Sequence, residues 1–196
     1  MTKLFFGAAL AALALATPSI APAQRTAAAS IVVVDTQRIF AECTACRAAQ
    51  TQLQTQVQQI QQRSQQLGQP LQTEAQAIQT AARGLNGKAP DAALQARITA
   101  LQTKQNTANQ ELQNRQQQFQ RNQAYVAQQI NTRLDPIITQ VMTTRGANIA
   151  IDKGTTLASA AALDVTNDVL AQLNQQLPSV NVNAPAQAQQ QPAQGR

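Results

Sequence analysis

Residues 50–85 read QTQLQTQVQQIQQRSQQLGQPLQTEAQAIQTAARGL, a run in which apolar residues recur in steps of four and three. The register extends back to Ile39. Its positions are Ile39, Cys43, Cys46, Gln50, Leu53, Val57, Ile60, Ser64, Leu67, Leu71, Glu74, Ile78, Ala81 and Leu85. Most of them are apolar, and a 3.5-residue period is typical of a coiled-coil seam rather than of a globular helix. The run therefore predicts a long helix that packs along a second helix.

A turn follows at residues 84–90, GLNGKAP, where Gly, Asn and Pro cluster and Pro90 suits the first turn of a new helix. The period then resumes and passes through a stutter near Val126. The positions are Leu94, Ile98, Leu101, Gln105, Ala108, Leu112, Arg115, Phe119, Val126, Ile130, Leu134, Ile137 and Val141. This pattern predicts an antiparallel helical hairpin with arms of about 40 residues, hence roughly 60 Å long at the rise of an α-helix.

One defect interrupts the outgoing arm at Gly68-Gln69-Pro70. A proline inside a helix removes a backbone hydrogen bond and clashes with the preceding turn. We therefore expect a kink or hinge at Gly68 and Pro70. A harmless kink in a tolerant, exposed helix is the alternative interpretation.

Short apolar runs flank the hairpin. Residues 30–35, SIVVVD, are typical of a buried strand, and Thr36 offers an N-cap for a helix that starts at Gln37. Residues 147–152, ANIAID, alternate as a second strand. Residues 155–163 are ambiguous and could hold another short strand. These runs predict a small β-containing body beside the hairpin.

The chain ends in a helix and a tail. Asp164 is expected to cap a helix over residues 165–177, which Pro178 stops. Residues 178–196 are rich in Pro, Ala, Gln and Asn, so we predict that they are disordered.

The N-terminus has the features of a secretory signal peptide. Lys3 precedes an apolar stretch over residues 4–16, and Ala21-Pro22-Ala23 forms an A-x-A cleavage pattern. The stretch is too short to span a membrane. We therefore predict a signal peptide over residues 1–23 and an exported, soluble mature protein. Body segments cover residues 24–40 and 134–177, the hairpin covers 41–133 with its tip at 84–90, and the tail covers 178–196.

Composition excludes several kinds of chemistry. The 196 residues include 37 Gln and 38 Ala but no His and no Trp. Without His there is no imidazole metal site and no Ser-His-Asp or Cys-His catalysis. The carboxylates are dispersed and there is no phosphate-binding loop. We therefore predict no catalytic residues, no cofactor site and no metal site, so the protein is not expected to be an enzyme.

Positive charge is concentrated on the hairpin. Between Cys43 and Arg133 there are nine basic and three acidic residues, whereas the rest of the mature chain is close to neutral. Such a surface attracts acidic partners over long range, although scattered Arg can also simply keep long helices soluble. The predicted partner-binding residues are Arg63, Arg83, Lys88, Arg97 and Lys104.

Cys43-Thr44-Ala45-Cys46 is the one motif with reactive groups. Redox enzymes place C-x-x-C at the start of a helix after a strand, but here a helical turn is expected first and both cysteines occupy seam positions. Two alternatives remain: a local structural disulfide between Cys43 and Cys46, or two small apolar residues that fill the seam.

The order of these elements resembles the Skp/OmpH family of periplasmic chaperones. The resemblance covers roughly Ser30 to Asn174 and rests on three motifs. They are VVVDTQRIF at 32–40, NIAIDKG at 148–154 and LDVTNDVLAQLN at 163–174, with the polar hairpin after the first. It implies a mainly α fold in which three coiled-coil tentacles project from a trimeric β-rich body around a cavity. It further implies a holdase that binds unfolded outer-membrane β-barrel proteins without ATP.

Self-association has its own rationale in the residues. A lone hairpin would leave the apolar strands exposed, so a homotrimer is expected to bury Ile31, Val33, Ile149 and Ile151.

The alternative function is that of a periplasmic coiled-coil scaffold or adaptor without chaperone activity. A pure scaffold would not need the strands that flank the hairpin. Nucleic-acid binding is disfavoured because the signal peptide exports the chain, and contact with a membrane surface is expected to be transient at most.

Overall fold

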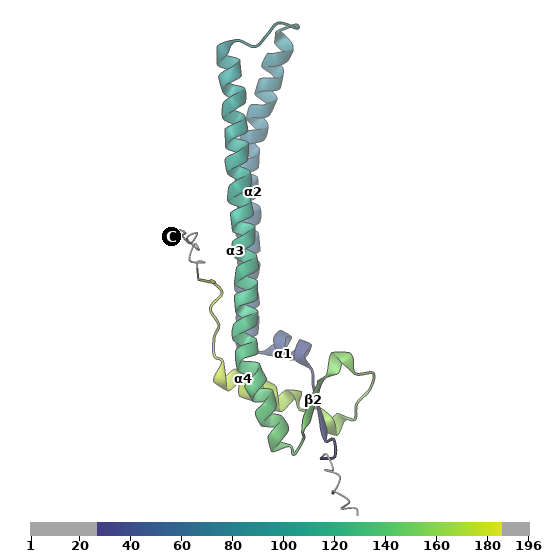
Figure 1. Cartoon of the computed structure of the whole chain (residues 1–196). Helices are drawn as coiled ribbons and strands as arrows, with labels where there is room; N and C mark the ends of the chain where they lie inside the picture. Colours follow the sequence, from purple (N-terminus) through teal and green to yellow (C-terminus); the bar gives the residue numbers. More distant parts are fainter. Residues whose placement is uncertain (1–26, 186–196) are drawn as a thin grey trace, which may run out of the picture.

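The computed structural model describes residues 27–185 (Figure 1), so the predicted signal peptide lies outside the described residues. A long pair of helices projects from a small base. The elements in chain order are β1 (Ile31–Val34), α1 (Thr36–Glu42), α2 (Thr44–Gly84), α3 (Ala92–Thr144), β2 (Ile149–Asp152), the 3-10 turns η1 (Lys153–Thr155) and η2 (Ala161–Leu163), and α4 (Thr166–Gln176).

The helices α2 and α3, of 41 and 53 residues, run antiparallel and lie side by side, and we call them with their connection the hairpin. Asn86 and Gly87 adopt left-handed backbone angles, with φ of 48° and 88°, which Asn and Gly tolerate best. The side chain of Asp91 then accepts a hydrogen bond from the Leu94 amide and caps α3. Pro90 therefore precedes the helix instead of standing in its first turn.

The sheet consists of β1 and β2, which pair in parallel with Ile31 opposite Ile149. The helices α1, α2 and α3 form the connection between the two strands, and this connection brings β2 back beside β1 in the same direction. Alternation in β1 places Val32 and Val34 in the core formed with the helices, whereas Ile31 and Val33 face the other side.

The hydrophobic core lies at the base of the hairpin. It combines β1, α1, the first turns of α2, the last turns of α3, and α4. Its largest fully buried side chains include Ile39, Ile130, Ile137, Val169 and Leu173. The far end of the hairpin carries no comparable cluster within the described residues, so the base is where burial stabilises the fold.

Two predicted helix starts differ in detail. Asp35, not Thr36, caps α1, because its carboxylate accepts a hydrogen bond from the Arg38 amide at 2.8 Å. The hydroxyl of Thr36 instead donates to Asp152 at the end of β2. The N-cap of α4 is Val165, and the Asp164 carboxylate, one residue earlier, accepts from the Thr166 amide. At the start of both helices, therefore, an aspartate carboxylate accepts a hydrogen bond from a backbone N–H of the first turn.

The structure also describes two segments that follow the strands and helices of the base. Residues 155–163, which the sequence left ambiguous, contain 3-10 turns and irregular chain and no strand, and the neighbouring Asp164 forms an isolated bridge with Val33. Residues 178–185, predicted to be disordered, run as an extended segment along the lower hairpin, and we call this segment the strap (Figure 1). Val182 of the strap is only 6 % exposed, which explains why the prediction of disorder is wrong there.

Candidate functional site on the hairpin

The seam between α2 and α3 follows the predicted period but is thin. Along α2 it consists of half-buried residues, namely Leu53, Val57, Ile60, Arg63, Leu67, Leu71, Glu74 and Ile78. Ser64 and Ala81, which the period placed in the seam, are exposed, and Arg63 lies inside in place of Ser64. In the upper part of α3 only Leu94 and Ala108 are buried. The arms therefore expose most of their polar surface.

Ion pairs connect the two arms where apolar contacts are few. Arg63 on α2 donates two hydrogen bonds to the two carboxylate oxygens of Glu111 on α3, at 2.8 and 2.9 Å. Arg115 adds a third at 2.9 Å from the next turn. Hydrogen bonds from Arg63 and then Arg115 lower the pKa of Glu111 to about 2. Nearer the tip, Arg97 and Glu74 form a second pair between the arms, and Arg97 lowers the pKa of Glu74.

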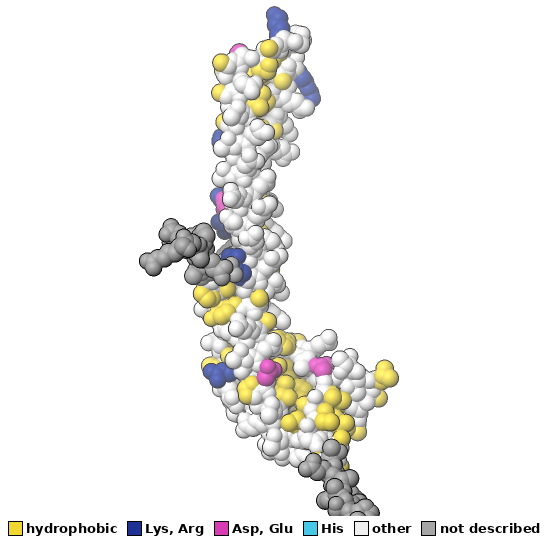
Figure 2. Space-filling view, in the orientation of Figure 1, with side chains coloured by type: hydrophobic (Ala, Val, Ile, Leu, Met, Phe, Trp, Pro, Cys, Tyr) yellow, Lys and Arg dark blue, Asp and Glu magenta, His cyan; other side chains and the backbone are white. Residues whose placement is uncertain are grey.

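These pairs divide the five predicted partner-binding residues into two groups. Arg63 and Arg97 are occupied within the chain by Glu111 and Glu74. Arg83, Lys88 and Lys104 are exposed and make no ion pair within residues 27–185. Figure 2 shows basic side chains gathered at the tip of the hairpin. Three of the five predicted residues therefore carry a charge with no ion-pair partner in this range, and the cluster of Arg63, Arg115 and Glu111 keeps one net positive charge because the two arginines share one carboxylate.

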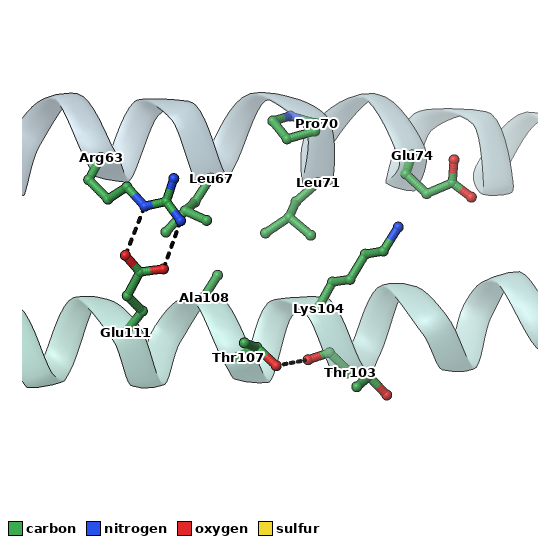
Figure 3. A pocket seen from close by; sticks show the side chains of 10 residues that line it. All are labelled: Arg63, Leu67, Pro70, Leu71, Glu74, Thr103, Lys104, Thr107, Ala108 and Glu111. Carbon is green, nitrogen blue, oxygen red and sulfur yellow. Dashed lines mark hydrogen bonds and ion pairs between the residues drawn. The ribbon is translucent and has the colours of Figure 1, made fainter.

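A crevice opens between the arms beside Pro70 (Figure 3). It has a volume of about 630 Å³, with Leu67, Leu71 and Ala108 as its apolar lining. Lys104 reaches from α3 across the gap toward α2, and the Arg63–Glu111 pair closes one end (Figure 3). The crevice thus combines an apolar lining with the ammonium group of Lys104.

Pro70 and Gly68 are exposed, and the helix continues through them from Thr44 to Gly84. The helix α3 likewise continues through Pro136. The hinge at Gly68 and Pro70 stays a prediction, because a continuous helix is compatible both with a straight arm and with a weakened one.

The base presents an apolar face on the side of the sheet away from the core. Ile31 and Ile149, which pair in the sheet, are 38 % and 41 % exposed. Leu163, in the turn η2 that contacts β1, is 38 % exposed, and Leu157 is fully exposed. Figure 2 shows apolar side chains at the surface of the base. Of the four predicted contact residues, Val33 is already buried within the chain and Ile151 is half-buried. Ile31 and Ile149 are the two that expose large surface.

Cys43 and Cys46 form a disulfide, with Cα atoms 5.1 Å apart. The prediction that both lie inside one continuous helix is wrong. Cys43 adopts an extended conformation between α1 and α2, and its sulfur accepts a hydrogen bond from the Cys46 amide. Both side chains are buried in the core at the base, so the disulfide braces the bend between α1 and α2.

Carboxylates also connect the segments of the base. Hydrogen bonds from Thr166 and then Lys153 lower the pKa of Asp164 to about 2, and the hydroxyl of Thr36 lowers the pKa of Asp152. Residues 27–185 contain no group of three potential metal ligands. Within this range no helix has the length and apolar character needed to cross a bilayer.

Sequence reasoning missed a cluster of amide side chains on the lower hairpin. Gln118, Asn122 and Gln129 of α3, with Gln56 of α2, hydrogen-bond to the strap or to one another. Gln is so frequent along both arms that composition could not single these residues out. Burial distinguishes Asn122, which is only 4 % exposed in a polar stretch.

A helical hairpin on a base with a small parallel sheet defines an elongated, mainly α class of protein. The sequence model of the family "Outer membrane protein (OmpH-like)" matches residues 30–173, and the chain belongs to this family. No curated protein sequence matches the chain. Among solved structures, a candidate outer membrane chaperone (OmpH-like) from Caulobacter crescentus CB15 superimposes with a TM-score of 0.68 at 19 % identity, covering 88 % of this chain and 99 % of its own.

Proposed function

We propose that the protein is an ATP-independent holdase chaperone of the periplasm that binds unfolded outer-membrane β-barrel proteins and prevents their aggregation. Membership of the OmpH-like family supports a chaperone-type role. The observation that carries the proposal is the hairpin itself, whose thin seam leaves a long polar and basic surface exposed. Such a surface offers many weak contacts and no single binding geometry.

We further propose that three chains associate through their bases, so that three hairpins surround a client cavity. Ile31 and Ile149 expose apolar surface on a sheet of only two strands, and burial of this surface against another chain would be favourable. Sedimentation equilibrium should give three times the subunit mass. Ile149→Asp should lower that mass, whereas Gln79→Asp, which adds the same charge on an exposed arm position, should not. A stable monomer would rule out this architecture.

The chaperone proposal is tested by dilution of a urea-denatured outer-membrane β-barrel protein into buffer without ATP. A stoichiometric amount of the protein should suppress light scattering, and an equal mass of serum albumin should not. A coiled-coil scaffold would leave the aggregation unchanged, and that outcome would refute the holdase proposal.

Three of the five predicted partner-binding residues make no ion pair within residues 27–185, and they supply a sharper test of steering. Replacing Arg83, Lys88 and Lys104 by Gln should slow client capture and flatten its salt dependence. The matched control replaces Arg97 and Glu74 together by Gln, which leaves the net charge unchanged. Equal capture rates for both variants at low salt would exclude electrostatic steering.

A further inference from the structure

The strap is held through its backbone, by carboxamide side chains of α3, and through Val180 and Val182, which pack on the core. The amide group of Gln129 donates to the Asn181 carbonyl at 2.8 Å and accepts from the Asn181 N–H at 3.0 Å. Three residues on, the Ala184 N–H donates to the Asn122 side chain at 2.9 Å, and Gln118 donates to the Ala184 carbonyl at 3.4 Å. Each of these two strap residues thus has both backbone groups bound by carboxamides of α3.

Such contacts do not depend on the sequence of the bound segment. A carboxamide offers a donor and an acceptor side by side, and every residue except proline offers the complementary pair on its backbone. The spacing of the carboxamides along α3 also matches the spacing of residues in an extended chain. Seven residues of helix, from Asn122 to Gln129, rise about 10 Å, and three residues of extended chain span about 10 Å. Extended chain can therefore keep register with α3.

The groove that the strap occupies also has an apolar side. Val180 and Val182 alternate with the outward Asn181 and pack on the core at the base. A further pocket of about 240 Å³ opens beside Asn183, with Ile60 and Phe119 among its lining residues. Apolar side chains of a bound segment thus have places to pack beside the carboxamides.

We propose that this groove is a binding site for extended polypeptide, recognised through its backbone, and that the strap occupies it as an internal competitor which an unfolded client displaces. The inference rests on the proposed chaperone function, whose substrate class it specifies. The match to the family ends at residue 173, before the strap begins. The competitor is therefore a feature of this chain outside the matched region.

The binding test uses the full mature chain with Val180→Asp and Val182→Asp, which should release the strap. The probe is a fluorescein-labelled peptide of residues 178–185, PSVNVNAP, followed by fluorescence anisotropy. The released variant should bind it at least tenfold more tightly than the wild type. If that variant loses helical circular dichroism, Asn181→Pro with Ala184→Pro serves instead, because these changes remove the two strap N–H donors without placing a charge against the core.

Chemical variants of the peptide separate backbone recognition from side-chain recognition. N-methylation at the residues that correspond to Asn181 and Ala184 should weaken binding roughly tenfold to a hundredfold, since two hydrogen bonds are lost and each costs roughly threefold to tenfold. Replacing both Asn side chains by Ala should change it little. On the protein, Gln129→Ala should weaken binding and Gln128→Ala, an exposed neighbour, should not. Equal binding of the methylated peptide would overturn the proposal.

Displacement is tested in the unaltered protein by amide hydrogen exchange. Addition of reduced, carboxymethylated α-lactalbumin, which is permanently unfolded, should abolish protection at Asn181 and Ala184, and native α-lactalbumin should not. If Asn181 and Ala184 stay protected when the unfolded probe is added, the proposal that a client displaces the strap is refuted. The two proposals fail separately. Suppressed aggregation without peptide binding refutes the groove alone, and peptide binding without suppressed aggregation refutes the holdase alone.

Discussion

Leu173→Ala should lower the stability of the whole hairpin, although Leu173 lies in the base. Leu173 lies on α4, is 0 % exposed, and packs in the core that joins β1, α1 and the lower ends of α2 and α3. Truncation of a fully buried leucine removes its transfer free energy and leaves a cavity, which together cost about 2 to 5 kcal/mol. Leu157→Ala, at a fully exposed leucine, is the matched control and should stay within about 0.5 kcal/mol of the wild type.

The arms should respond because they hold little burial of their own. Beyond Ala49 the helix α2 contains no buried residue, and the upper part of α3 contains only Leu94 and Ala108. Most of the stability of helices in proteins comes from packing, and this seam supplies little of it. Their helical signal should therefore be lost together with the base in one transition.

The measurement is urea denaturation followed by circular dichroism at 222 nm, with all variants at one protein concentration because association shifts apparent stability. We expect a single transition whose midpoint falls in Leu173→Ala and stays in place in Leu157→Ala. A shift worth less than about 1 kcal/mol would refute the role of this core. Two transitions, with helices that outlast the base, would refute the dependence of the arms on it.

Three further outcomes follow from individual residues. The carboxyl of Glu111 should titrate by ¹³C NMR near pH 2 instead of near 4.5, and Arg63→Gln should raise its pKa. Because the folded pKa is the lower one, the stabilisation from Glu111 is complete above about pH 4.5 and disappears as the pH falls toward 2. Gly68→Ala with Pro70→Ala should raise the unfolding midpoint, since an added Cβ at Gly68 meets nothing within 4 Å; a lower midpoint would exclude helix weakening there. Reduction of the disulfide should cost on the order of 2 kcal/mol for so short a loop, measured by unfolding with and without dithiothreitol; an unchanged midpoint would contradict this.

Periodicity predicted the long helices well because a seam is a local property of the chain. Leu53, Val57, Ile60 and Leu67 lie in the seam at the positions that steps of four and three assign. The break at Cys43 was invisible to the same reasoning. Cys43 and Cys46 are buried in the structure, as a continuous heptad would also have them, so the pattern of burial does not reveal that the helix stops and restarts.

Pairings across the hairpin could not be predicted from composition. Arg63 and Glu111 are 48 residues apart, and they meet only because the turn fixes the register of α3 against α2. The strap escaped prediction for a related reason. Its Pro, Asn and Gln residues indicate disorder, and the opposing signal is only the alternation of Val180 and Val182. The two valines indicate an ordered segment only when the folded base, against which they pack, is known.

The abundance of Gln on the arms acquires a physical reason from these contacts. A glutamine keeps a helix intact almost as well as lysine or glutamate does, yet it adds no charge that would repel a neighbouring arm. It also carries a donor and an acceptor, as Gln129 shows on the backbone of Asn181. Stability is concentrated in the base, and the backbone-binding carboxamides lie on the lower part of α3. Substitution of a strap-binding glutamine such as Gln129 should therefore change polypeptide binding while leaving the unfolding midpoint almost unaltered, whereas Leu173→Ala should change both.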